Sequence, residues 1–111
     1  MLHFFSLGSG SCGNCYYVSD GEIAILIDAG VGIRRFKRNM RDYGIKVSNI
    51  KAILITHDHA DHIKAVGHIS NEINVPVYTT ETIHNSIKNN FNAIRKINNE
   101  HIRHIEELSP F

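Results

Sequence analysis

The sequence predicts an α/β fold, with strands first in a meander and then strands that alternate with helices. Two observations lead to this prediction. Short apolar runs rich in β-branched and aromatic residues, separated by glycine-containing turns, occupy the first part of the chain. Farther along, apolar residues recur at helical spacing between further short runs. The 111 residues are 42% hydrophobic and 21% charged. This is an ordinary globular composition, so we expect a single domain.

The first part of the chain predicts three strands. Residues 2–7 have an apolar bias with aromatic side chains, residues 15–19 continue the pattern, and residues 22–28 are apolar enough for a central strand. Asp20-Gly21 is a strong signal for a two-residue hairpin between the last two strands. Residues 8–14 are rich in glycine and serine and predict a tight loop.

The rest of the chain predicts helices between short strands. Helical spacing of apolar residues runs from residue 33 to residue 43, where Gly44 is a good helix stop. A strand at residues 52–56 leads into a helix expected from about residue 60 to residue 73. A short strand at 75–78 and a helix at 80–90, with Thr80 as candidate N-cap, follow. Residues 91–111 are ambiguous, with a turn at 98–99 and an imperfect strand pattern at 101–108.

The most informative segment is His57-Asp58-His59-Ala60-Asp61-His62, which follows the strand predicted at 52–56. Imidazole and carboxylate groups are the ligands that suit zinc, manganese and iron. In an extended segment residues i and i+2 point the same way, so His57 and His59 could face one ion. Asp61 and His62, in the first turn of the following helix, could face a second ion. The alternative is a polar loop with exposed histidines.

This run, with its strand before and its helix after, resembles the H-x-H-x-D-H signature of the metallo-β-lactamase superfamily. The resemblance implies that His57 and His59 bind one divalent ion and that Asp61 and His62 bind a second, each ion being zinc or manganese. Asp28, which closes an early strand, would then orient the metal ligands. Asp61 and Asp58 are the expected catalytic carboxylates, Asp58 by orienting a ligand or assisting proton transfer.

Two further segments narrow the resemblance to one branch of the superfamily. The glycine–serine run at 6–14 and the segment 61–67 are similar to the YycJ/VicX/WalJ-like bacterial branch of that superfamily. The likeness extends to about Tyr78. The superfamily fold is an αββα sandwich about twice as long as this chain, so residues 1–111 are expected to be its N-terminal half. No residue after Thr79 matches the remaining metal ligands. The C-terminal half, or a second copy, is expected to cover the sheet.

Three functions remain open at this point. The branch resemblance implies a metal-dependent phosphodiesterase or nuclease that uses a metal-activated water, with nucleic acid as the partner. A second candidate is another hydrolase on the same scaffold, a thioesterase of the glyoxalase II type or a lactamase. The third is an inactive, truncated half-domain that binds metal without turnover.

Other features of the sequence exclude or leave open further functions. The net charge is +1 and no apolar run approaches the length of a membrane span, so a cytoplasmic location is the default expectation. The run from Gly8 to Gly13 matches a dinucleotide-binding fingerprint, but the strand and hairpin signals after it leave no room for the required helix. Cys12 and Cys15 are expected to be small structural residues, with Cys15 buried.

A basic cluster lies on the helix predicted at 33–43. Its members are Arg34, Arg35, Lys37, Arg38 and Arg41. One interpretation is an ordinary solvated face. The other is a surface that contacts the phosphate backbone of a nucleic acid.

Overall fold

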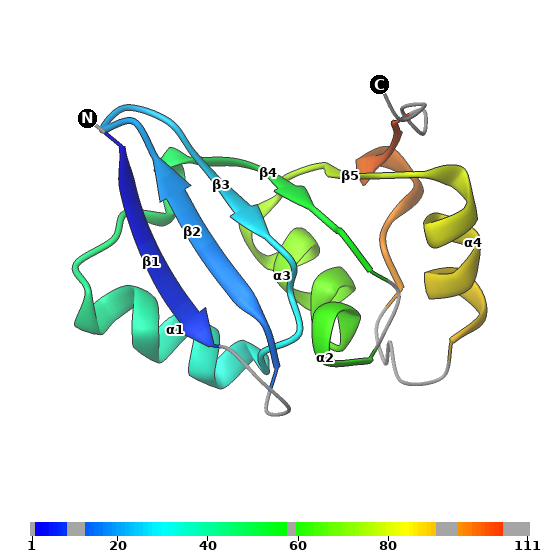
Figure 1. Cartoon of the computed structure of the whole chain (residues 1–111), viewed down its shortest axis with the longest axis horizontal. Coiled ribbons are helices and arrows are strands. Elements are labelled where there is room, and N and C mark those ends of the chain that lie inside the picture. The colour runs from blue at the N-terminus through cyan, green and yellow to red at the C-terminus, as the bar shows by residue number, and fades with distance from the viewer. Residues whose placement is uncertain (1, 9–12, 58–59, 91–95, 106–111) are drawn as a thin grey trace, which may run out of the picture.

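The computed structural model describes residues 2–8, 13–57, 60–90 and 96–105. In this part of the chain six strands form one sheet in the order β1-β2-β3-β4-β5-β6, so the predicted α/β class is confirmed (Figure 1). The strands are β1 (His3–Gly8), β2 (Cys15–Ser19), β3 (Ala24–Ile27), β4 (Ile50–Leu54), β5 (Val77–Thr79) and β6 (Ile102–His104). The first three pair antiparallel as the predicted meander, and β3 to β6 pair parallel.

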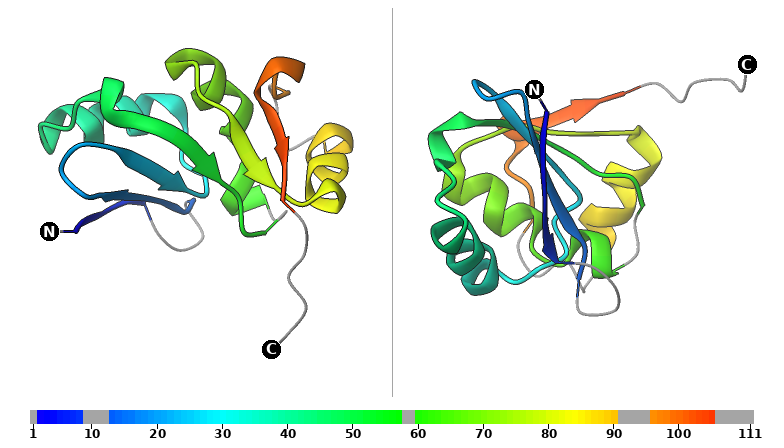
Figure 2. Two further views of the ribbon diagram at one scale, coloured as in Figure 1. Left: turned by 90° about the horizontal axis from the view of Figure 1, so that it is seen from above. Right: turned by 60° about the vertical axis from the view of Figure 1, so that its left-hand side comes forward.

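Helices cover one face of this sheet. The α-helices are α1 (Ile33–Asp42), α2 (Ala60–Ile63), α3 (Val66–Ile73) and α4 (Glu81–Asn89), and the short 3-10 helices are η2 (Val47–Asn49) and η3 (Asn99–His101). Figure 2 shows α1 and α3 on the same side of the strands, with α4 beside β6. None of the described helices is long and apolar enough to cross a bilayer.

The two faces of the sheet differ in burial. Leu26, Ile53 and Val77 occupy neighbouring positions on β3, β4 and β5, face the helices and are fully buried. The alternate positions, such as Ile27 and Leu54, lie on the opposite face and are only half-buried. No described element covers the second face, which is the face that the C-terminal half or a second copy is expected to cover.

The helix expected from residue 60 to residue 73 is broken, and this prediction is wrong. The backbone N–H of Ala29 donates to the His62 carbonyl over 2.8 Å, and the Ala65 N–H donates to the Ala29 carbonyl over 2.9 Å. In a continuous helix the His62 carbonyl and the Ala65 N–H would form hydrogen bonds within the helix, whereas here both bond to Ala29 in the loop after β3. As a result α2 ends at Ile63 and α3 begins at Val66.

The connection between β2 and β3 is longer than the predicted two-residue hairpin, because β3 begins at Ala24 rather than at Glu22. The Asp20 carboxylate accepts hydrogen bonds from the backbone N–H groups of Glu22 and Ile23 at 2.9 and 3.0 Å. These donors lower the pKa of Asp20. A side chain that caps its own turn in this way stabilises a four-residue loop.

Other element predictions agree to within a few residues. Gly44 ends α1 with a φ of 65°, and the Thr80 side chain caps α4 by accepting from the Ile83 N–H. The strand expected at 101–108 begins at Ile102, and residues 106–108 lie outside the described part of the chain. His101 belongs instead to η3, where it is buried against Ser70 and Asn74.

Cys15 is fully buried at the start of β2, as predicted. Desolvation, with a smaller contribution from the charge of Asp28, raises its pKa to about 12. Since the thiolate is the reactive species, the native thiol is inert near neutral pH.

We expect Cys15 to resist alkylation in the folded protein. In a Cys12→Ser background, iodoacetamide at pH 8 should modify Cys15 about a thousandfold more slowly than in the unfolded chain, because the pKa is about 12 instead of 9.0. Mass spectrometry of quenched time points measures both rates. Equal rates in native buffer and in guanidinium would contradict the burial.

Candidate metal centre

The candidate site lies where β3 and β4 end and α2 begins. Parallel strands bring their carboxyl ends to the same edge of a sheet, and here Ile27 pairs with Leu54. Asp28 directly follows β3, His57 follows β4 after two residues, and His62 lies in α2. Figure 1 shows the end of β3 close to α2, although the two are far apart in sequence.

Asp28 is the buried centre of this arrangement, with 3% of its surface exposed. Its backbone is left-handed, with a φ of 63°, a conformation that Asp tolerates better than most residues. Its N–H donates to the Leu54 carbonyl over 2.7 Å. Asp28 thereby leaves the strand direction and turns its carboxylate toward the end of β4.

Thr56 connects Asp28 to His57. Its backbone N–H donates to Asp28 Oδ1 over 2.8 Å, and its hydroxyl lies 3.0 and 2.8 Å from the two carboxylate oxygens, to which it donates. The same hydroxyl oxygen lies 2.8 Å from His57 Nδ1. A hydroxyl has one proton, so donation to Asp28 leaves its oxygen to accept from His57 Nδ1–H. This contact selects the tautomer of His57 that would bind metal through Nε2.

His62 is held by Asp28 directly. Its Nδ1 lies 2.8 Å from Asp28 Oδ2, which selects the same tautomer as in His57. The ring centroids of His57 and His62 are 4.9 Å apart. Ligand atoms of Asp28, His57 and His62 all lie within 4.8 Å of one another. One carboxylate therefore orients two imidazoles that come from different elements.

A close backbone contact between Gly13 and Gly30 supports the loop that carries Asp28. Gly13 has a φ of 118°, and a Cβ on it would lie 2.5 Å from the Gly30 carbonyl oxygen. The Gly30 N–H donates to the Asn14 carbonyl over 2.9 Å. The glycine-rich segment therefore brings backbone close to the loop of Asp28, and β2 follows it directly at Cys15. No helix begins at Gly13 or Asn14, which agrees with the rejection of the dinucleotide fingerprint.

The structure brings together only part of the predicted ligand set. His57 and His62 lie side by side, and Asp28 contacts His62 as an orienting residue would. Asp58 and His59 lie outside the described residues, as does the side chain of Asp61. No feature of the sequence points to Thr56 as a member of the site. Its role depends on the proximity of two strand ends, which no local pattern reveals.

Comparisons with known proteins agree with this fold. The family model for the metallo-β-lactamase superfamily matches residues 10–107. The chain belongs to the metallo-β-lactamase superfamily. Solved structures support the fold: a subclass B3 metallo-β-lactamase with an active-site glutamic acid has a TM-score of 0.75 at 16% identity, over 94% of this chain and 43% of that one. The Rm3 metallo-β-lactamase has a TM-score of 0.67 at 20% identity, over 76% of this chain and 32% of that one.

The curated relatives that match include exodeoxyribonucleases and probable metallo-hydrolases. Exodeoxyribonuclease YycJ of Bacillus anthracis is 36% identical over 87 residues, which are 78% of this chain and 33% of the relative. Exodeoxyribonuclease WalJ of Streptococcus pneumoniae is 32% identical over 83 residues, 75% of this chain and 31% of the relative. The chain spans about a third of the length of these relatives.

The metallo-β-lactamase fold implies divalent metal binding, and the chemistry of the residues present fits such ions. The buried Asp28 carboxylate contacts no Lys or Arg among the described residues, and its partners there are Thr56 and His62. A buried carboxylate without a cation is costly by several kcal/mol. Cations held by the neighbouring histidines would provide the compensating charge. A carboxylate behind a ligating imidazole also raises the basicity of that ligand.

We expect Asp28→Asn to weaken metal binding roughly 10- to 100-fold, the usual cost of losing a group that orients a ligand. Thr56→Val should act in the same direction, whereas Thr56→Ser keeps the hydroxyl and should retain affinity. Titration calorimetry with Zn²⁺ measures each affinity. Asp20→Asn, an exposed carboxylate in the β2–β3 loop, is the matched control. Wild-type affinity in Asp28→Asn would contradict the orienting role.

Proposed function

We propose that this protein acts as a metal-dependent hydrolase of DNA phosphodiester bonds. The observation that carries the proposal is the pair of oriented imidazoles, His57 and His62, in a chain that is 36% and 32% identical to two exodeoxyribonucleases. The relatives at 36% and 32% identity support a phosphodiester substrate, whereas the lactamase structures, at 16% and 20% identity, support the fold alone.

In the proposed site His57, His59, Asp61 and His62 hold two divalent ions, zinc or manganese. When bound, such ions would lower the pKa of a coordinated water and stabilise negative charge on the phosphoryl group. Asp28 and Thr56 keep the imidazoles in the ligating tautomer. Asp58, beside His57, is proposed to orient a ligand or to accept a proton. The remaining ligands are proposed to come from the rest of the domain, because two protein ligands per ion fall short of the usual three or four.

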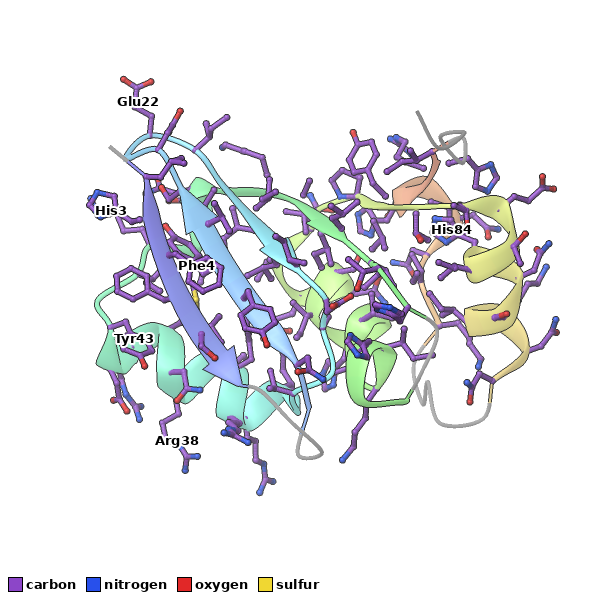
Figure 3. The ribbon with its side chains drawn as sticks, in the orientation of Figure 1. His3, Phe4, Glu22, Arg38, Tyr43 and His84 are labelled. Carbon is purple, nitrogen blue, oxygen red and sulfur yellow. The ribbon has the colours of Figure 1, made fainter. Side chains whose placement is uncertain are left out.

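The nuclease proposal predicts that the complete domain, of which this chain is proposed to be one half, cleaves DNA in a metal-dependent reaction that requires His57. We expect Mn²⁺ to support degradation of end-labelled DNA, EDTA to abolish it, and His57→Ala to reduce both bound metal and cleavage at least 100-fold. His3→Ala, an exposed histidine on β1, should change neither (Figure 3). Thioester and β-lactam substrates are assayed in parallel.

The outcomes separate the candidate functions. Activity on a thioester or a lactam alone would replace the nuclease proposal with another hydrolase. Bound metal without turnover of any substrate would favour the non-catalytic half-domain. Either result, obtained with the complete domain, would overturn DNA hydrolysis as its activity. The cytoplasmic location expected from the sequence stays a prediction.

We also propose that residues 1–111 are the N-terminal half of a larger domain, whose second half, or a second copy, covers the open face of the sheet. Two apolar rows cross that face in register: Phe4–Val18–Ile25–Ala52, and Tyr16–Ile27–Leu54–Tyr78. Phe4 is 62% exposed and Tyr78 is 36% exposed. Continuous apolar surface of this kind marks an interface. A sheet packed face to face at about 10 Å would bury both rows.

The open face predicts self-association of the isolated chain. Sedimentation should show dimers or larger species that bind a hydrophobic dye, and Ile27→Lys with Leu54→Lys should shift them toward monomer, since both side chains project from the uncovered face. Circular dichroism checks that the variant keeps its secondary structure. A compact wild-type monomer that binds no dye would contradict the proposal.

A further inference from the structure

Helix α1 carries a row of cations that the proposed metal chemistry does not use. A helix advances about 100° per residue, so Arg34, Arg38 and Arg41 fall within a sector about 60° wide. The buried residues Phe36 and Met40 lie on the opposite side and fix the orientation of the helix against the core. All three arginines are exposed. We call Arg34, Arg38 and Arg41 the basic row.

The other two cations of α1 point elsewhere. Lys37 forms an ion pair with Glu72 of α3 and so belongs to the contact between the helices. Arg35 is half-buried on the far flank of the helix, which Asn39 ties to β1 by donating to the Leu7 carbonyl over 2.8 Å. The basic row is thus separated by geometry from the cations with structural roles.

Little within the described structure neutralises the basic row. Arg34 and Arg38 form no ion pair among the described residues. Arg41 Nε lies 4.0 Å from Asp42 Oδ1, and both side chains are largely exposed, so this pair is weak. Figure 3 shows Arg38 projecting away from the sheet. Three guanidinium groups therefore present a concentrated positive charge to solvent in a chain whose net charge is only +1.

The row lies close to the candidate metal centre. Arg34 follows Asp28 by six residues, which limits the separation of their Cα atoms to about 20 Å. Figure 1 shows that the loop after β3 leads into α1, which then runs past the lower ends of β2 and β1. A linear polyanion held at the metal centre could therefore continue along α1.

We propose that the basic row binds the phosphate backbone of duplex DNA and holds the substrate along α1. This inference rests on the proposed function. Arg34 to Arg41 spans about 10 Å of helix, which corresponds to about three phosphates of one strand at roughly 3.4 Å of axial rise each. The exposed positions of the row include no aromatic side chain, so bases have no surface for stacking and the contact is independent of sequence.

The test is the salt dependence of DNA binding, measured in EDTA so that no cleavage occurs. Fluorescence anisotropy with a labelled 20-base-pair duplex gives the affinity between 50 and 200 mM NaCl. Each phosphate contact contributes about 0.9 to the slope of log affinity against log salt. We expect Arg34→Gln with Arg38→Gln to reduce the magnitude of the slope by about 2. As NaCl rises from 50 to 200 mM, the variant should therefore lose roughly tenfold less affinity than the wild type does.

Matched variants distinguish the basic row from net charge and from misfolding. Lys46→Gln with Lys51→Gln removes two charges from exposed positions at the opposite end of β4 and should leave the slope nearly unchanged. Arg34→Lys with Arg38→Lys keeps the charge and should retain the slope. Asp42→Asn removes the carboxylate beside the row and should strengthen binding, an effect that a folding defect cannot produce.

An unchanged slope in the variant Arg34→Gln with Arg38→Gln would overturn the proposal. An equal reduction of the slope in the control Lys46→Gln with Lys51→Gln would overturn it too. So would the absence of DNA binding by the wild-type chain at 50 mM salt, or preferential binding of an acidic protein or an anionic vesicle. Failure of the nuclease proposal has a different signature, in which metal-dependent cleavage is absent while the slope still falls. The two proposals can therefore fail separately.

Discussion

The buried carboxylate of Asp28 is the constraint on which the site depends. It receives hydrogen bonds from the backbone and the hydroxyl of Thr56 and contacts the imidazole of His62. These partners come from the end of β4 and from α2, so one side chain joins three elements that no local interaction would hold together. Its burial makes each of these bonds stronger than it would be in water and makes the loss of any of them expensive.

The sequence predicts this centre only in part, for reasons that can be named. Alternating histidines after an apolar strand are a local pattern, so the segment from His57 to His62 is recognisable without a structure. The contact between Thr56 and Asp28 spans 28 residues of chain and depends on the parallel pairing of β3 with β4. Composition and spacing carry no information on that pairing, and Thr56 is therefore missed.

The fold shows the same division between local and distant causes. The strand at Cys15–Ser19 and the caps at Gly44 and Thr80 are correctly predicted because their signals are local. The break between α2 and α3 is not, because the apolar spacing of residues 60–73 fits one continuous helix. The break comes from the backbone of Ala29, more than thirty positions earlier in the chain. Tertiary hydrogen bonds overrode an adequate helical pattern there.

That backbone contact has a consequence for how a metal ion would meet the protein. Ala29 engages the segment after the metal loop through both its N–H and its carbonyl, so hydrogen bonds of the protein itself hold the turn that carries His62 against the core. An ion arriving at this side of the site would not have to order the segment first. The entropy lost on ordering this segment is lost during folding, so it does not reduce the affinity of an ion for His62.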